Sequence, residues 1–362
     1  MYALVLLTTS CSEEQTVTAP EEPDNRVELQ LLPFVQDYRE VQPSPSSRRR
    51  VGPPSGYTAY APLVSPEIGV FVTEGSEMEA GTFAKEEGIW KTRVCISNGR
   101  NYNIYGYMPE DGVTGATIAP NGSYANGCVL TLPGLRTIAT TDVCFVTGVK
   151  QAASSLAISA VDGLVPGAFG YTGKSVEDGN YIYMLFDHLY AAIEFNIKVD
   201  ADYDALRTIK VRSMTVKSTR YTTGTATVTI AANPYGADPV TDVAWAYSSG
   251  NCEETIFAWD SADPSTRLEL TTSSQRIGSC LIVPGVNSSA GNYLMLRTVY
   301  DIYDKDGVLI REGQVSDNQI PTLAHVAHNE RTQLNLTVKP TYLHVLGDND
   351  IDNPADFTAV TD

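Results

Sequence analysis

The histidines are the side chains in this sequence best suited to metal binding and acid–base chemistry, and there are four: His188, His325, His328 and His344. His325 and His328 lie three residues apart, a spacing that would place both rings on one helical turn and could suit a metal ion. Their neighbours offer no third ligand at a useful spacing. The sequence also lacks a nucleophile elbow, a zinc-protease motif and a glycine-rich phosphate loop. We therefore expect no metal, no cofactor and no enzymatic activity.

The aromatic residues could serve another chemistry, the stacking of sugar rings. Trp90, Trp245 and Trp259 are candidate platforms, although isolated tryptophans in β-rich proteins more often pack in the core. The 43 acidic residues leave room for a pair of catalytic carboxylates, which only the fold could bring together. A surface lipoprotein that binds glycans is therefore an alternative function, and a secreted hydrolase is a more remote one.

Cys11 has the surroundings of a lipid attachment site. It follows an apolar run at residues 2–7 and three small residues, and Ser12, Glu13 and Glu14 come after it. This pattern is similar to the end of a bacterial lipoprotein signal, in which the cysteine becomes the acylated N-terminus. The run is short and no basic residue precedes it, which a start codon placed too late would explain. We expect an exported protein tethered through Cys11; the alternative is an apolar N-terminus with an incidental cysteine.

The five other cysteines show no zinc-binding spacing: Cys95, Cys128, Cys144, Cys252 and Cys280. Cys128 could pair with Cys144, and Cys252 with Cys280. Burial as small apolar side chains is an equally good interpretation. The sequence leaves the disulfides open.

Composition limits the partners. The 25 basic and 43 acidic residues give a formal net charge of −18, which repels nucleic acid and anionic lipid surfaces. Hydrophobic residues make up 43% of the chain, enough for sizeable cores. No apolar stretch reaches the ~18 residues of a membrane-spanning helix. We expect no nucleic-acid partner, and contact with a membrane only through the lipid anchor.

Short alternating runs predict that the chain is built from β-strands. Residues 193–199 alternate apolar and polar side chains, and a change of phase near Arg212 and Ser213 predicts a β-bulge. Residues 294–303 and 308–315 flank Asp304–Gly307, which predicts a hairpin. Long amphipathic helices are absent from the pattern. The predicted fold class is all-β, with two antiparallel β-sandwich domains in series.

Changes in composition divide the chain into four parts, with the boundary between the two sandwich domains placed in the glycine-rich stretch 161–179. The predicted parts are a lipoprotein signal region (1–11), a tether with a first strand and a cleavage loop (12–50), an N-terminal β-sandwich (51–178) and a C-terminal β-sandwich (179–362).

The first strand is separated from the rest by an unusual loop. Val27, Leu29 and Leu31 alternate with polar residues, and the apolar pattern continues through Phe34 to Val35. A proline-rich stretch follows that carries Arg48, Arg49 and Arg50, the densest basic cluster in an acidic protein. Such a loop is open to a trypsin-like protease.

Several segments, in this order, resemble the fimbrillin family, the lipoprotein precursors of type V pili in Gram-negative anaerobes. The matching segments are Cys11 with its acidic followers, residues 27–35, the Arg48–Arg50 loop, residues 68–72, residues 189–195 and the closing segment 342–354. The likeness extends over nearly the whole chain. It implies two transthyretin-like β-sandwiches in one pilus subunit.

The resemblance also implies an assembly mechanism. After lipid-anchored export, an arginine-specific protease would cut after Arg48, Arg49 or Arg50 and remove the strand that carries Val27, Leu29, Leu31 and Phe34. A strand from a neighbouring subunit would then refill the groove. Three consecutive arginines before Val51 differ from the usual single arginine, so the exact bond is left open.

The physical chemistry of such a cut is favourable. About four apolar side chains at ~1.5–3 kcal/mol each make the groove worth on the order of 10 kcal/mol, as an upper value. The groove must be refilled by another strand, because its backbone groups and pockets would otherwise be left without partners. The predicted donor lies near the C-terminus, in residues Leu334, Leu336 and Val338 or in Tyr342, Leu343 and Val345.

These inferences lead to one expected function. The chain is expected to be a structural and adhesive pilus subunit, first an outer-membrane lipoprotein and then part of a cell-surface pilus. Its expected partners are other pilus subunits, self or related, an arginine-specific protease and a receptor on a host or bacterial surface. Whether it forms the stalk, the tip or an anchor, and what it binds, cannot be read from the sequence.

Overall fold

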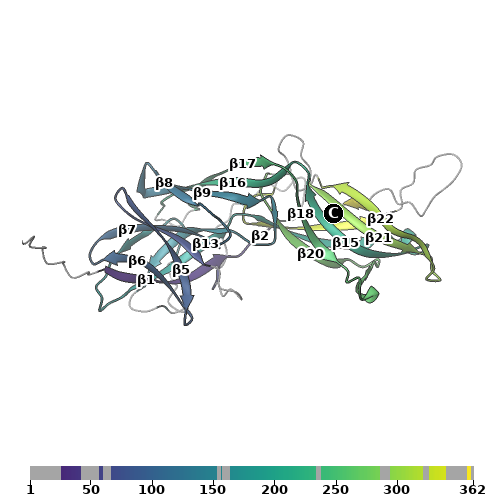
Figure 1. Cartoon of the computed structure of the whole chain (residues 1–362), viewed down its shortest axis with the longest axis horizontal. Helices are drawn as coiled ribbons and strands as arrows, with labels where there is room; N and C mark the ends of the chain where they lie inside the picture. The colour runs from purple at the N-terminus through teal and green to yellow at the C-terminus, as the bar shows by residue number, and fades with distance from the viewer. Residues whose placement is uncertain are drawn as a thin grey trace, which may run out of the picture.

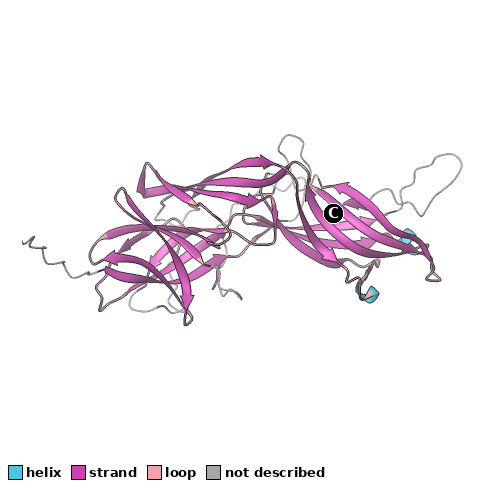
Figure 2. Ribbon diagram, in the orientation of Figure 1, coloured by secondary structure: helices cyan, strands magenta, loops and turns pink. Residues whose placement is uncertain are grey.

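The computed structural model describes residues 26–41, 57–59, 67–152, 156, 164–233, 238–285, 294–320, 326–339 and 357–359. These residues are almost entirely β-strand, as the alternating sequence pattern predicts (Figure 2). Their helical parts are a single turn, α1 (Ala201–Asp204), and a short 3-10 segment, η2 (Pro264–Thr266). Within this described part of the chain, no helix is long and apolar enough to cross a bilayer.

The first sheet has nine strands and contains the predicted first strand. Its order is β11-β13-β1-β6-β5-β4-β7-β12, β3 pairs with β1, and a further pairing of β7 with β11 closes the sheet on itself. Every pair is antiparallel except β1 with β13. The strands are β1 (Arg26–Gln36), β3 (Tyr57–Ala59), β4 (Ile68–Glu74), β5 (Glu77–Glu86), β6 (Ile89–Ser97), β7 (Asn101–Met108), β11 (Cys144–Gln151), β12 (Gly170–Thr172) and β13 (Asn180–His188).

The second sheet has six strands, in the order β10-β20-β14-β23-β2, with β24 also on β23. Its middle is parallel, because β14 and β2 both run parallel to β23. Its strands are β2 (Arg39–Val41), β10 (Ile138–Ala139), β14 (Ala191–Val199), β20 (Gln275–Ile282), β23 (Glu330–Val338) and β24 (Phe357–Ala359).

The third sheet faces the second and is antiparallel throughout, in the order β18-β15-β21-β22, with β19 on β15. Its strands are β15 (Thr208–Ser218), β18 (Cys252–Ala258), β19 (Leu268–Glu269), β21 (Met295–Tyr303) and β22 (Leu309–Gln319). The predicted bulge is confirmed by a register shift between Val211 and Ser213. The predicted hairpin is confirmed as well: Asp304 accepts hydrogen bonds from the main-chain N–H groups of Asp306 and Val308.

A fourth, joining sheet combines strands from both halves of the sequence. Its order is β17-β16-β9-β8, and the central pair, β9 with β16, is antiparallel. Its strands are β8 (Thr117–Asn121), β9 (Ser123–Arg136), β16 (Tyr221–Ala231) and β17 (Val240–Ser249). Figure 1 shows the first sheet as one lobe, the second and third sheets as the other, and the joining sheet running between them.

The predicted domain boundary at 178/179 falls just before β13. Strand β13 begins at Asn180 and pairs with β1 and β11, so it belongs to the first sheet. The chain changes sheets between the end of β13 at His188 and the start of β14 at Ala191. The glycine-rich stretch that suggested a boundary contains β12 and leads into β13, two strands of the same sheet. Glycine content marks a loop, but it does not determine which sheet the next strand joins.

Among the described residues, no two cysteines are joined by a disulfide. Cys128, Cys144, Cys252 and Cys280 are buried, and Cys95 is half-buried. The interpretation as small apolar core residues therefore holds, and neither suggested disulfide is formed.

Candidate functional site

Strand β1 is an interior strand of the closed first sheet (Figure 1). On one side, Leu29–Val35 run parallel to residues 180–186 of β13. On the other side, residues 26–31 pair with β6, and residues 34–36 pair with β3. Because both edges of β1 are bonded, its removal would leave two unpaired sheet edges facing one slot.

The side chains of β1 enter the core on both faces of the sheet. Leu29, Leu31 and Phe34 are 0%, 1% and 3% exposed, whereas Val27 is half-buried. Leu29 and Leu31 belong to the large core cluster. Phe34 packs in a smaller cluster with Tyr183, where the two ring centroids lie 6.1 Å apart. Full burial of three such side chains is worth roughly 5–9 kcal/mol as an upper value.

The end of β1 is held by polar contacts. The main-chain carbonyl of Gln36 accepts a hydrogen bond from Nε2 of His188 at 2.8 Å. The buried amide of Gln36 donates to Oγ1 of Thr147 at 3.3 Å. Two residues further on, the ring of Tyr38 stacks on His188 with centroids 3.7 Å apart, and its hydroxyl donates to Oδ2 of Asp142 at 2.9 Å. The segment is therefore fixed by hydrogen bonds where it leaves the first sheet.

His188 faces an acceptor with each of its ring nitrogens. Nδ1 lies 2.5 Å from Oδ2 of Asp142, and Nε2 faces the carbonyl of Gln36. A carbonyl can only accept, and a carboxylate accepts as well, so both nitrogens carry protons and the ring is an imidazolium. Burial alone would lower the pKa of His188, but the hydrogen bond and charge of Asp142, the charge of Asp187 and the Gln36 carbonyl raise it.

The segment then crosses to the second lobe. The main-chain N–H of Arg39 donates to the carbonyl of Asn329 at 2.9 Å, and its guanidinium donates to the carbonyl of His328 at 3.0 Å. Strand β2 then runs parallel to the start of β23. One continuous segment, residues 26–41, thus contributes a strand to each lobe.

Asp187 lies beside this crossing. It is buried, accepts a hydrogen bond from the main-chain N–H of His188, and lies 3.9 Å from Nε2 of His328. Burial raises the pKa of Asp187 to about 7, although the charges of His188 and Arg39 act to lower it. The carboxyl therefore titrates near neutral pH at the point where the segment passes between the lobes.

The predicted functional residues fall into three groups. The removable-strand residues Val27, Leu29, Leu31 and Phe34 lie in β1 as predicted. Leu334, Leu336 and Val338 of the predicted donor are buried in β23, in the core of their own lobe. The residues outside the described part are Cys11, Arg48, Arg49, Arg50, Tyr342, Leu343, Val345, His325 and His344.

The candidate sugar platforms are largely occupied. Trp90 is 2% exposed and lies in the core. The guanidinium of Arg267 lies 4.1 Å from the ring centroid of Trp259, and that of Arg212 lies 5.5 Å from it. Both arginines also contact the buried carboxylate of Asp301. Trp245 is half-buried and stacks with Tyr247 in β17. The aromatic side chains thus give the glycan alternative no specific support.

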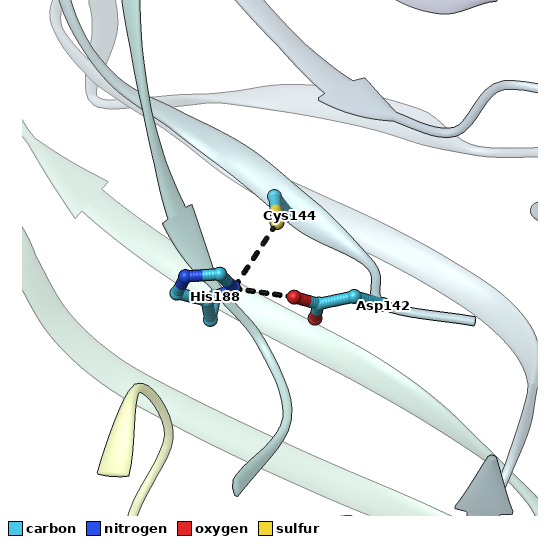
Figure 3. A group of neighbouring side chains, drawn as sticks. All are labelled: Asp142, Cys144 and His188. Carbon is cyan, nitrogen blue, oxygen red and sulfur yellow. Dashed lines mark hydrogen bonds and ion pairs between the residues drawn. The ribbon is translucent and has the colours of Figure 1, made fainter. Parts of the chain in front are cut away.

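Three side chains that the sequence analysis did not single out as a group converge beside Tyr38. Asp142, Cys144 and His188 bring their ligand atoms within 4.8 Å of one another (Figure 3). Both the thiol and the carboxylate lie next to the same ring nitrogen, Nδ1 of His188. A cysteine–histidine–aspartate triad needs these two groups on opposite ring nitrogens, so the cluster is not arranged for nucleophilic catalysis. The available sequence signal was the polar pair Asp187-His188 at the end of an apolar strand.

No known protein family and no curated protein matches this sequence. Among solved structures, it is similar to a fimbrial protein of Bacteroides vulgatus ATCC 8482, with 11% identity and a TM-score of 0.40 over 75% of this chain and 87% of the other. A candidate cell adhesion protein of Bacteroides uniformis ATCC 8492 has 11% sequence identity and a TM-score of 0.39, over 88% of this chain and 94% of the other. The fimbrial anchor protein Mfa2 of Porphyromonas gingivalis has 10% sequence identity and a TM-score of 0.28, over 88% of this chain and 94% of the other. These three similar structures are those of two fimbrial proteins and a candidate cell adhesion protein.

Proposed function

We propose that this chain is a pilus subunit, structural and adhesive rather than enzymatic, that polymerises on the cell surface by strand exchange. An arginine-specific protease cuts the loop at Arg48–Arg50 in a lipid-anchored, exported precursor. Strand β1 then leaves, and a strand from another subunit takes its place. The proposal includes the finer fold assignment, two transthyretin-like sandwiches in series.

The observation that carries the proposal is the position of β1. It is bonded on both edges within a closed sheet and fills apolar pockets on both faces. Its only covalent link to the later strands passes through residues 42–56, which include the three arginines. One cut in that link converts a strand of the same chain into a dissociable peptide. The open slot then favours any chain that can restore the hydrogen bonds and the buried leucines.

The donor is expected to come from the C-terminus. Tyr342, Leu343 and Val345 belong to a short, mostly apolar run that follows β23 in the sequence. Strand β23 packs its apolar side chains in the core of the second lobe, and it ends at Val338. A donor beyond residue 339 would leave that core intact, whereas a donor within β23 would destroy it.

A lysine replacement of the cleavage site tests the proposal. The triple variant Arg48→Lys, Arg49→Lys, Arg50→Lys keeps the charge but resists an arginine-specific protease, whereas trypsin still cuts it. The wild-type precursor is expected to lose its first segment and form oligomers with either protease, as seen by gel filtration and electron microscopy. The triple variant should assemble only after trypsin treatment. A cut wild-type chain that stays monomeric and retains β1 would refute the proposal.

Truncation after Lys339 tests the donor separately. The shortened chain keeps β23, but it lacks Tyr342, Leu343 and Val345 and also β24, which pairs with residues 336–338 of β23. It should still be cut at the arginines and yet fail to form oligomers. Normal assembly of this truncated chain would exclude the C-terminal donor and leave the cleavage step untouched.

A further inference from the structure

The cluster of Asp142, Cys144 and His188 has the composition of a transition-metal site. Thiolate, imidazole and carboxylate are the ligands that zinc takes in proteins. Cys144 opens β11, His188 closes β13, and the two residues are direct partners in the pairing of these strands. Asp142 lies in the turn just before β11. Two paired strands therefore hold two of the ligands, and a short turn brings the third (Figure 3).

The distances fit tetrahedral coordination with a small adjustment. Sγ of Cys144 and Nδ1 of His188 are 3.5 Å apart. Zinc–sulfur and zinc–nitrogen bonds of ~2.3 and ~2.05 Å at a tetrahedral angle place these atoms about 3.5 Å apart. Oδ2 of Asp142 is 2.5 Å from Nδ1, roughly 1 Å closer than two ligands of one zinc ion would lie. The Asp142 side chain is 30% exposed and belongs to a turn, so it has room to make that shift.

One further contact is that expected around a metal-binding histidine. Nε2 of His188 donates to the carbonyl of Gln36, and ligand histidines commonly donate their second ring N–H to a carbonyl, which fixes the ring. Oδ1 of Asp142 is buried and has no hydrogen-bond partner among the described residues.

Among the described residues, this is the one place where three such ligands converge. Cys280 is equally buried, but it belongs to no such group. Burial and the neighbouring carboxylates raise the pKa of the Cys144 thiol, so without a metal ion it stays protonated. A bound cation reverses this preference, because a coordinating thiol is deprotonated.

We propose that Asp142, Cys144 and His188 bind one zinc ion through Oδ2, Sγ and Nδ1, with the fourth position open to a water molecule. Binding releases two protons to solvent, one from Sγ of Cys144 and one from Nδ1 of His188. The Nε2 proton stays in its hydrogen bond to Gln36. All three ligands lie in the body of the first lobe, outside the segment that the proposed cleavage removes, whereas Gln36 and Tyr38, which contact His188, belong to that segment.

Cobalt substitution of the full chain tests the site, with Cys11→Ser in every sample so that Cys11 cannot supply a thiolate. Titration with cobalt chloride should give a thiolate-to-cobalt charge-transfer band and the strong d–d bands of tetrahedral coordination. Cys144→Ser should abolish the charge-transfer band, whereas Cys280→Ser, the matched buried control, should keep it. Zinc should displace the cobalt at one ion per chain.

Milder variants keep the test informative if Cys144→Ser fails to fold. Asp142→Asn retains the size of a partly exposed side chain and should weaken zinc affinity by roughly 100-fold or more, since loss of a supporting contact alone costs ~10–100-fold. Zinc should also raise the Tm of the Cys11→Ser chain. Absence of the charge-transfer band in the Cys11→Ser chain, or an unchanged band in a folded Cys144→Ser variant, would overturn the proposal.

Discussion

Strands β1 and β23 occupy equivalent places in the two lobes. Each is an interior strand, each runs parallel to a neighbour, and each buries leucines in the core. They differ in their connections. Strand β23 pairs with β14 over eight positions, 192–199 against 331–338, and is followed by the C-terminal segment. Strand β1 precedes the arginine loop and is followed by polar contacts rather than by a tight turn.

The burial of a strand does not determine whether that strand can be exchanged. The two strands contribute similar apolar contacts, so burial alone cannot mark one of them as exchangeable. The difference lies in the covalent link, because a cut beside β1 removes the chain connection that keeps its effective concentration high. Hydrophobic burial then favours β1 and an incoming donor alike.

The largest effect is expected from matched leucine substitutions in the two strands. Leu31→Ala and Leu336→Ala each remove a buried leucine side chain and should lower the free energy of unfolding of the precursor by about 2–5 kcal/mol. In the assembled, cleaved protein, Leu31→Ala should have no effect, because β1 has left. Leu336→Ala should remain just as damaging. Urea unfolding of the precursor and of the assembled protein measures the change in the free energy of unfolding for each variant in each form.

Equal effects of Leu31→Ala before and after assembly would show that β1 stays in place. Loss of the Leu336→Ala effect after assembly would instead identify β23 as the strand that moves.

A smaller, pH-dependent effect is expected at the crossing between the lobes. The pKa of Asp187 is about 7 in the folded chain, above its ordinary value of 3.8, so the folded state binds this proton more tightly. Its contribution to stability is full below pH ~4 and is lost as the pH rises through 7, at up to roughly 1.4 kcal/mol per unit. Asp187→Asn, which cannot ionise, should therefore gain stability relative to wild type across this range by a few kcal/mol. Urea unfolding from pH 4.5 to 7.5 measures the difference in the free energy of unfolding between the variant and wild type. A difference that stays constant with pH would contradict the prediction.

The smallest effect is expected from single hydroxyl deletions. Tyr38→Phe keeps the stacking on His188 but loses the bond to Asp142, at a cost of about 1 kcal/mol. Departure of β1 after cleavage should accelerate roughly fivefold. Tyr303→Phe, which loses a bond to Arg267 in the second lobe, is the matched control. It should lower stability similarly without changing the release of β1, as followed by mass spectrometry of the bound segment.

Local patterns predicted the strands well. The alternation of Val27, Leu29 and Leu31 identified β1, and the phase change at Arg212 identified the bulge. The interior position of β1 was harder to foresee, because Pro33 cannot donate to a ladder and is usual at edges. In the structure Pro33 lies opposite Met184 of β13, and on the other side of β1 it falls between the end of the pairing with β6 at Leu31 and the start of the pairing with β3 at Phe34.

The polar cluster could not be predicted, because its members are distant in sequence. Cys144 and His188 become neighbours only through the register of β11 and β13, and Tyr38 reaches them from a third segment. The pairing of β9 with β16 across the predicted halves is likewise a long-range event. Alternation specifies which face of a strand is buried, but it does not specify which strand becomes the neighbour.

The joining sheet has a mechanical consequence. Strands β9 and β16 are paired at eight positions, from Arg136 with Thr223 to Gly127 with Ala231, and they come from opposite sides of the change between lobes. A tensile load that enters one lobe and leaves through the other is carried by this ladder as well as by the covalent linker. In a fibre under flow, the subunit would therefore resist stretching as a single unit rather than extend at its waist.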